Sequence, residues 1–116
     1  MTRKIDLFIK DILDEMTNAE NFLSDLGFDE FLKDTKTSYA VVRCIEIIGE
    51  ATKNIPTNLK QKHKEIPWKK MAGMRDKIIH FYFGVKYQVV WSTIKEEIPQ
   101  LKPLIEKLYL DLTLGK

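Results

Sequence analysis

The sequence predicts an all-α protein that folds as an up-and-down, four-helix-type bundle with short additional helices. Apolar residues recur at three- and four-residue spacing along most of the chain, which is the pattern of amphipathic helices. The breaks between these runs are short and contain Gly or Pro, and no stretch alternates as a strand would. With 116 residues, of which 44% are hydrophobic, we expect residues 1–116 to form a single domain around one core.

Two long helices are predicted in the first half of the chain. The first covers residues 5–26, and Gly27 is expected to end it because glycine readily adopts the conformation that closes a helix. A short helical piece over 29–33 follows. The second long helix begins near Tyr39 and stops before Pro56, because the residue that precedes a proline avoids helical conformation.

The second half of the chain is predicted to continue in helices. A short polar helix over 57–63 precedes a third main helix over about 68–83. The next helix covers 87–98. Pro99 either kinks it or starts a further helix that runs through Leu108.

Composition excludes several classes of protein and site. Nineteen Lys and Arg against seventeen Asp and Glu leave a charge of +2, so bulk electrostatics do not argue for nucleic-acid binding and any polyanion site must be local. A single cysteine, Cys44, cannot form an intramolecular disulfide, and two histidines do not supply a structural zinc site. The N-terminus has no signal-peptide pattern, and no apolar run reaches membrane-spanning length. We expect a cytoplasmic protein with no membrane contact, no bound metal and no cofactor.

Arg75 stands out on the predicted third helix. On a helical wheel it lies within the apolar stripe that includes Trp68 and Ile78, and an unpaired buried guanidinium costs several kcal/mol. It therefore needs a carboxylate in a core or interface ion pair, which is the commoner case, or a polar ligand. His80 would lie about 140° further round the helix. The two could meet through the long arginine stem, a helical bulge, or a dimer in which two copies of the helix converge.

Carboxylates at helical spacing could support these two residues. Asp76, four residues before His80, would favour a charged imidazole, although such a pair is more often an exposed one without consequence. The second helix carries Arg43, Glu46 and Glu50 on the side that also holds Tyr39. This row is either a solvated face or the source of the carboxylate that holds Arg75, namely Glu46 or Glu50.

Positive charge is concentrated between residues 60 and 77, where six lysines and Arg75 face only two acidic residues. Lys69, Lys70 and Lys77 are the candidates for a rim that attracts phosphates beside the segment with Arg75 and His80. The alternative is a lysine-rich surface that only keeps the protein soluble.

Residues 75–82, Arg-Asp-Lys-Ile-Ile-His-Phe-Tyr, resemble the R-x4-H-x-Y signature of the HEPN superfamily in its HepT-like ribonuclease toxin branch. The segment 43–51, Arg-Cys-Ile-Glu-Ile-Ile-Gly-Glu-Ala, and the Ile-Pro-Trp at 66–68 fall in the order and spacing of that branch. Val90-Trp91 and the Ile-Pro-Gln-Leu at 98–101 do so too. The resemblance covers nearly the whole chain.

This resemblance implies a small helical homodimer that cuts RNA without a metal ion and is encoded beside a minimal nucleotidyltransferase, the antitoxin that adenylylates it. Arg75 and His80 would be catalytic, and Tyr82 would accept the AMP group. Two other functions stay open. One is a non-catalytic HEPN module that binds a nucleotide or a partner protein through the same residues. The other is a small DNA-binding helical domain, for which no recognition helix stands out.

Overall fold

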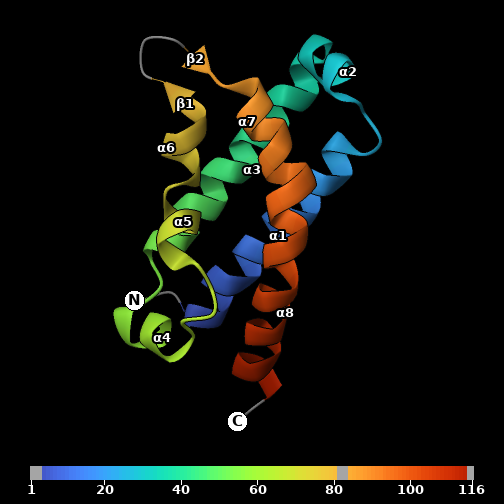
Figure 1. Ribbon diagram of the computed structural model, residues 1–116. Helices are drawn as coiled ribbons and strands as arrows, with labels where there is room; N and C mark the ends of the chain where they lie inside the picture. The colour runs from blue at the N-terminus through green and yellow to red at the C-terminus, as the bar shows by residue number, and fades with distance from the viewer. Residues whose placement is uncertain (1–3, 81–83, 115–116) are drawn as a thin grey trace.

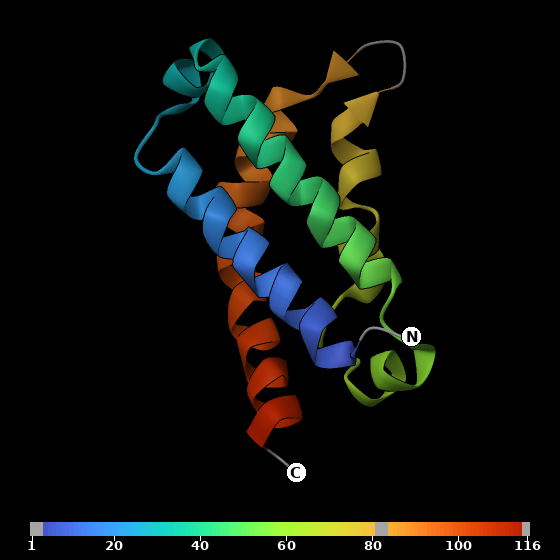
Figure 2. The ribbon, with the colours of Figure 1, turned by 180° about the vertical axis from the view of Figure 1, so that it is seen from behind.

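The computed structural model describes residues 4–80 and 84–114, and it confirms the all-α prediction. Three long helices form the body of the molecule: α1 (Ile5–Leu23), α3 (Thr35–Lys53) and α8 (Ile98–Leu114). Figure 1 shows α8 running downward at an angle to α1, which it contacts, and Figure 2 shows α3 running alongside α1. α1 therefore lies at the centre of the fold.

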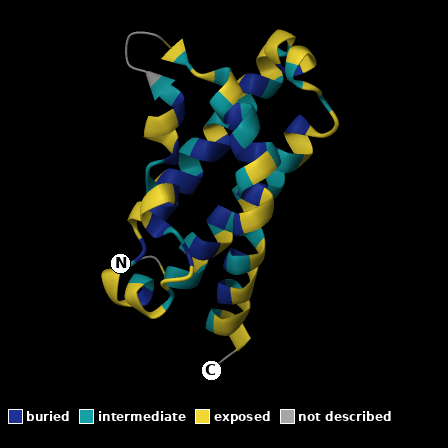
Figure 3. Ribbon diagram, viewed as in Figure 1, coloured by how far each residue is buried: buried dark blue, intermediate teal, exposed yellow. Residues whose placement is uncertain are grey.

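The core lies between these long helices. The buried face of α1 carries apolar residues at the predicted spacing, namely Ile9, Ile12, Met16, Ala19 and Leu23. They face an equivalent stripe on α3, whose buried members include Val41, Ile45 and Ile48. Figure 3 shows exposed residues on the outer faces of the same helices. Burial of these stripes is the main stabilising contribution, at about 25 cal/mol per Å² of apolar surface.

Polar contacts determine where α1 ends and α3 begins. Ser24 adopts a left-handed φ of 50° and donates its N–H to the Glu20 carbonyl, so α1 ends three residues before the predicted position. The short helix α2 (Phe28–Lys33) follows as predicted. The carboxylate of Asp34 then accepts a hydrogen bond from the Thr37 N–H at 3.0 Å and caps α3.

The predicted single helix over 68–83 is wrong. After α4 (Thr57–Lys62) the chain forms two separate short helices, α5 (Trp68–Ala72) and α6 (Met74–Ile78), with Gly73 between them. Glycine is a weak helix former, which explains why the helix breaks there.

A small strand pair follows α6, although the sequence showed no strand alternation. β1 (Ile79–His80) pairs antiparallel with β2 (Gly84–Val85), Ile79 opposite Val85 and His80 opposite Gly84. Two features favour this change. Ile78 and Ile79 are β-branched, and Gly84 has a φ of 78°, which only glycine adopts at little cost.

The last part of the chain forms a nearly continuous rod. α7 (Tyr87–Ser92) runs into a π-helical turn, η1 (Thr93–Glu97), in which the Ile98 N–H donates to the Thr93 carbonyl. Pro99 has no N–H to donate to the carbonyl four residues earlier, and the widened turn lies directly before it. Helix α8 thus starts next to Pro99, as one of the two predicted alternatives proposed. Within residues 4–80 and 84–114, no helix is long and apolar enough to cross a membrane.

Candidate functional site

Arg75 lies on the outer face of α6 and not in the core. Met74 and Ile78 are the buried residues of this helix, and the Arg75 side chain is 45% exposed. The prediction of a buried Arg75 is therefore wrong, because it assumed one regular helix from 68 to 83 and Gly73 interrupts that helix. In its observed position the guanidinium is accessible to a ligand from solvent.

A chain of charges connects Arg75 with α3. Its Nε lies 3.6 Å from Oε2 of Glu46, whose Oε1 lies 3.8 Å from Nη1 of Arg43. Nη1 of Arg75 also lies 3.5 Å from Oδ1 of Asp76. Glu46 thus lies between two arginines and is 28% exposed, and it is the carboxylate of the second long helix that lies beside Arg75. Glu50 is not this carboxylate: it lines a separate hollow of about 250 Å³ beside Arg43.

Gly49 brings the two helices together at this point. A Cβ atom on Gly49 would lie 3.3 Å from the carbonyl oxygen of Ala72 and 3.9 Å from Cβ of Arg75. The missing side chain lets α3 pass close to the junction of α5 and α6, which places Glu46 within reach of Arg75. Our sequence reasoning missed this residue. Its signal was a glycine inside a strongly helical pattern, which costs about 1 kcal/mol and usually has a packing reason.

His80 lies on a strand, which changes its predicted relation to the neighbouring residues. The backbone is extended at 79–80, so neither the 140° separation from Arg75 nor the helical pairing with Asp76 applies. Asp76 instead pairs with Arg75 and is largely exposed. Tyr82, the third residue of the signature and the predicted AMP acceptor, lies outside the described residues.

Two of the three predicted rim lysines share one carboxylate. Nζ of Lys70 lies 3.3 Å from Oε1 of Glu97, and Nζ of Lys77 lies 3.3 Å from Oε2 of the same residue. Lys69 makes no such pair with any residue that the structure describes. We did not anticipate Glu97 from the sequence, because it is 20 residues from Lys77 and only the packing of η1 brings it near. The rim is thus held in place and partly neutralised.

In the described part of the chain, no three His, Cys, Asp or Glu side chains come together as a metal site would require. The chemistry-bearing groups that the structure brings together are therefore Arg75 with Glu46, Asp76 and Arg43, beside the lysines of α5 and α6.

Comparison with known proteins places this arrangement in a family. The family described as "Ribonuclease HepT-like" matches residues 12–108. A protein of Methanocaldococcus jannaschii named "Putative RNase MJ0125" is 49% identical over 110 residues, which cover 95% of each chain. "Probable ribonuclease HepT" of Thermococcus cleftensis is 51% identical over 108 residues, covering 93% of this chain and 98% of that one. No solved structure matches. The match over most of the chain and the high identity to full-length relatives show that this protein belongs to the HepT-like family of the HEPN superfamily.

Proposed function

We propose that the protein is an endoribonuclease in which Arg75 and His80 carry out the cleavage. The observation that carries this proposal is the exposed guanidinium of Arg75, held on one side by Glu46 and open to solvent over 45% of its side chain. Family membership supports the same reaction, because relatives of nearly the same length are named as ribonucleases.

The proposed reaction needs three things. A base removes the proton of the ribose 2′-hydroxyl, a cation stabilises the charged phosphorane formed by attack on phosphorus, and an acid protonates the departing 5′-oxygen. The His80 imidazole would move protons, since its ordinary pKa lies near neutrality. The Arg75 guanidinium would bind the phosphorane oxygens through the N–H groups that its carboxylate partners leave open. Attack by the 2′-hydroxyl leaves a 2′,3′-cyclic phosphate and requires no metal ion.

The test is cleavage of single-stranded RNA by the wild type and by Arg75→Ala and His80→Ala. We expect each variant to lose at least about a thousandfold in kcat/KM while keeping its circular dichroism spectrum. The wild type should be as active in EDTA as without it, and its products should carry cyclic phosphate. Full activity of His80→Ala, or loss of wild-type activity in EDTA, would contradict the mechanism.

The functional unit is proposed to be a homodimer in which the two α6 segments approach each other. Besides the resemblance, the exposed face of α3 supports this arrangement: Tyr39 is 71% exposed, and Arg43 follows one turn later with its side chain 70% exposed. A large aromatic side chain left in solvent beside a candidate active site is typical of a surface that a partner covers.

Regulation by a minimal nucleotidyltransferase is proposed from the resemblance alone. In this toxin-antitoxin pair the partner would transfer AMP to Tyr82 and so place a phosphodiester near Arg75, which would repel the RNA phosphate. We expect a minimal nucleotidyltransferase to be encoded next to this protein; incubation with it and ATP, followed by peptide mass spectrometry, should locate the modification on Tyr82. Normal inactivation of Tyr82→Phe by the same treatment would exclude this acceptor.

A further inference from the structure

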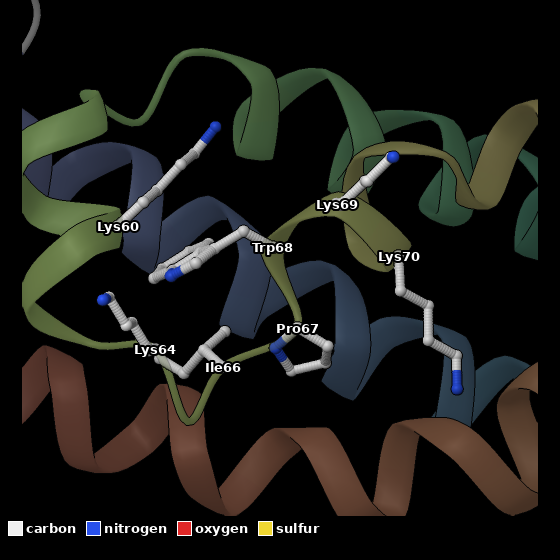
Figure 4. A pocket seen from close by; sticks show the side chains of 7 residues that line it. All are labelled: Lys60, Lys64, Ile66, Pro67, Trp68, Lys69 and Lys70. Carbon is white, nitrogen blue, oxygen red and sulfur yellow. The ribbon is translucent and has the colours of Figure 1, made fainter.

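Four lysines surround a groove of about 620 Å³ between α4 and α5. Figure 4 shows the rings of Pro67 and Trp68 along the middle of the groove. Lys60 and Lys64 lie at one end, and Lys69 and Lys70 at the other. None of the residues that line the groove is acidic. The groove does not include Arg75 or Glu46. Its residues belong to the segment that directly precedes α6, the helix that carries Arg75.

Three of these lysines carry uncompensated charge. Lys70 pairs with Glu97, whereas the side chains of Lys60, Lys64 and Lys69 have no hydrogen bond or ion pair with any residue in the described ranges. Like charges held around one hollow raise the local positive potential and attract a polyanion. This concentration is notable because the whole chain carries only +2.

The floor of the groove shows what kind of contact is possible. Trp68 is only 7% exposed, and its Nε1 donates to the His63 carbonyl at 3.0 Å, so the indole offers neither a free stacking face nor a free donor. A ligand would therefore meet ammonium groups and a shallow apolar floor, without groups that distinguish one base from another. Such a surface recognises phosphates spaced along a chain.

The groove also lies close enough to Arg75 for one RNA strand to contact both. Lys69 and Arg75 are six residues apart, so even a fully extended chain would place their Cα atoms no more than about 20 Å apart. Building on the proposed function, we infer that this groove binds the phosphodiester backbone of the RNA substrate outside the cleavage site, independently of base sequence. A strand of several nucleotides spans this length, and longer RNA is held by Lys60, Lys64 and Lys69 together.

The experiment measures binding without cleavage. A fluorescein-labelled 2′-O-methyl oligouridine of roughly 20 nucleotides lacks the attacking hydroxyl, and its binding is followed by anisotropy across a series of KCl concentrations. Each phosphate contact of a single strand contributes about 0.7 to the salt slope of the binding constant, so the triple variant K60Q/K64Q/K69Q should lose about 2 from the wild-type slope.

The matched control is K33Q/K36Q/K107Q, which removes the same charge elsewhere. Lys33 and Lys36 line another hollow, which unlike the groove also contains two acidic residues, Glu30 and Asp34, and Lys107 is exposed on α8. We expect this control to keep the wild-type slope. Circular dichroism of both triple variants verifies that each is folded.

Two results would overturn the inference. The first is a salt slope of the binding constant in K60Q/K64Q/K69Q equal to that of the wild type. The second is displacement of the oligonucleotide by polyglutamate of equal charge as effectively as by unlabelled oligonucleotide, which would indicate an acidic protein partner. A different result would refute the proposed ribonuclease function without refuting the groove. Wild-type protein that shows the expected slopes but does not cut unmodified RNA would refute the nuclease and leave the groove established as an RNA site.

Discussion

The side chain that matters most after Arg75 is Glu46, because it contacts the guanidinium from the neighbouring helix. Glu46→Gln keeps the shape and removes the charge, so the guanidinium should be held less firmly. For an ion pair this exposed we expect its loss to raise the activation free energy by at most about 1 kcal/mol, hence up to a fivefold loss in kcat/KM. The matched control is Glu50→Gln, one turn further along α3, which should retain wild-type activity. Equal losses in both variants would exclude a specific role for Glu46.

Cys44 provides a test of burial at the level of one atom. Burial, together with a hydrogen bond to the nearby carboxylate of Glu15, raises the pKa of the Cys44 thiol to about 12. An unfolded thiol ionises near pH 8.5, so above that pH the unfolded chain releases a proton that the folded one keeps, and stability falls as the pH rises. At pH 8 the folded protein should react with a disulfide reagent at least about a hundredfold more slowly than the protein unfolded in guanidinium. Equal rates would show that this thiol is accessible.

At the scale of elements, the start of α3 is predicted to depend on pH. The Thr37 N–H hydrogen bond lowers the pKa of Asp34, so the folded state favours the charged carboxylate. The resulting contribution to folding stability is fully present above the unfolded pKa of about 3.9. It is lost as the pH falls through the lower pKa of Asp34 in the folded state. Asp34→Ala should therefore melt at a lower temperature than the wild type at pH 7, with the difference shrinking at pH 3. Asp34→Asn, which still caps the helix, is the control, and a pH-independent Ala difference would contradict the assignment.

The same scale shows which elements could be predicted from the sequence and which could not. Long amphipathic stripes identify α1, α3 and α8 because burial of one face determines both the element and its orientation. The helix predicted over residues 68–83 was wrong. Its apolar residues fit a helical pattern, but a single glycine favoured a break and β-branched residues favoured a strand pair. Glu46 was one of the two carboxylates that the sequence offered as a partner of Arg75. Glu97 and Gly49 could not be predicted, because they act through contacts between residues far apart in the sequence.

For the whole molecule, we predict that two chains associate. Light scattering should give twice 13.6 kDa at micromolar concentration, and Tyr39→Glu should shift the protein toward monomer because it puts a charge into the proposed interface. Leu110→Glu is the control: it replaces another exposed apolar side chain, 52% exposed on α8, and should leave the mass unchanged. A wild-type monomer at this concentration would refute the dimer.

The π-helical turn η1 makes one place in the C-terminal rod tolerant to a change in chain length. A π turn accommodates one residue more than an α turn, so deleting one residue from Thr93–Glu97 would restore a regular helix and leave both flanks facing the same way. A deletion inside α8 would instead rotate every later residue by about 100° and turn Ile105 and Leu108 away from the core. Natural length variants of this rod are therefore expected at η1, and such a variant would have to hold Lys70 and Lys77 without Glu97 in its present place.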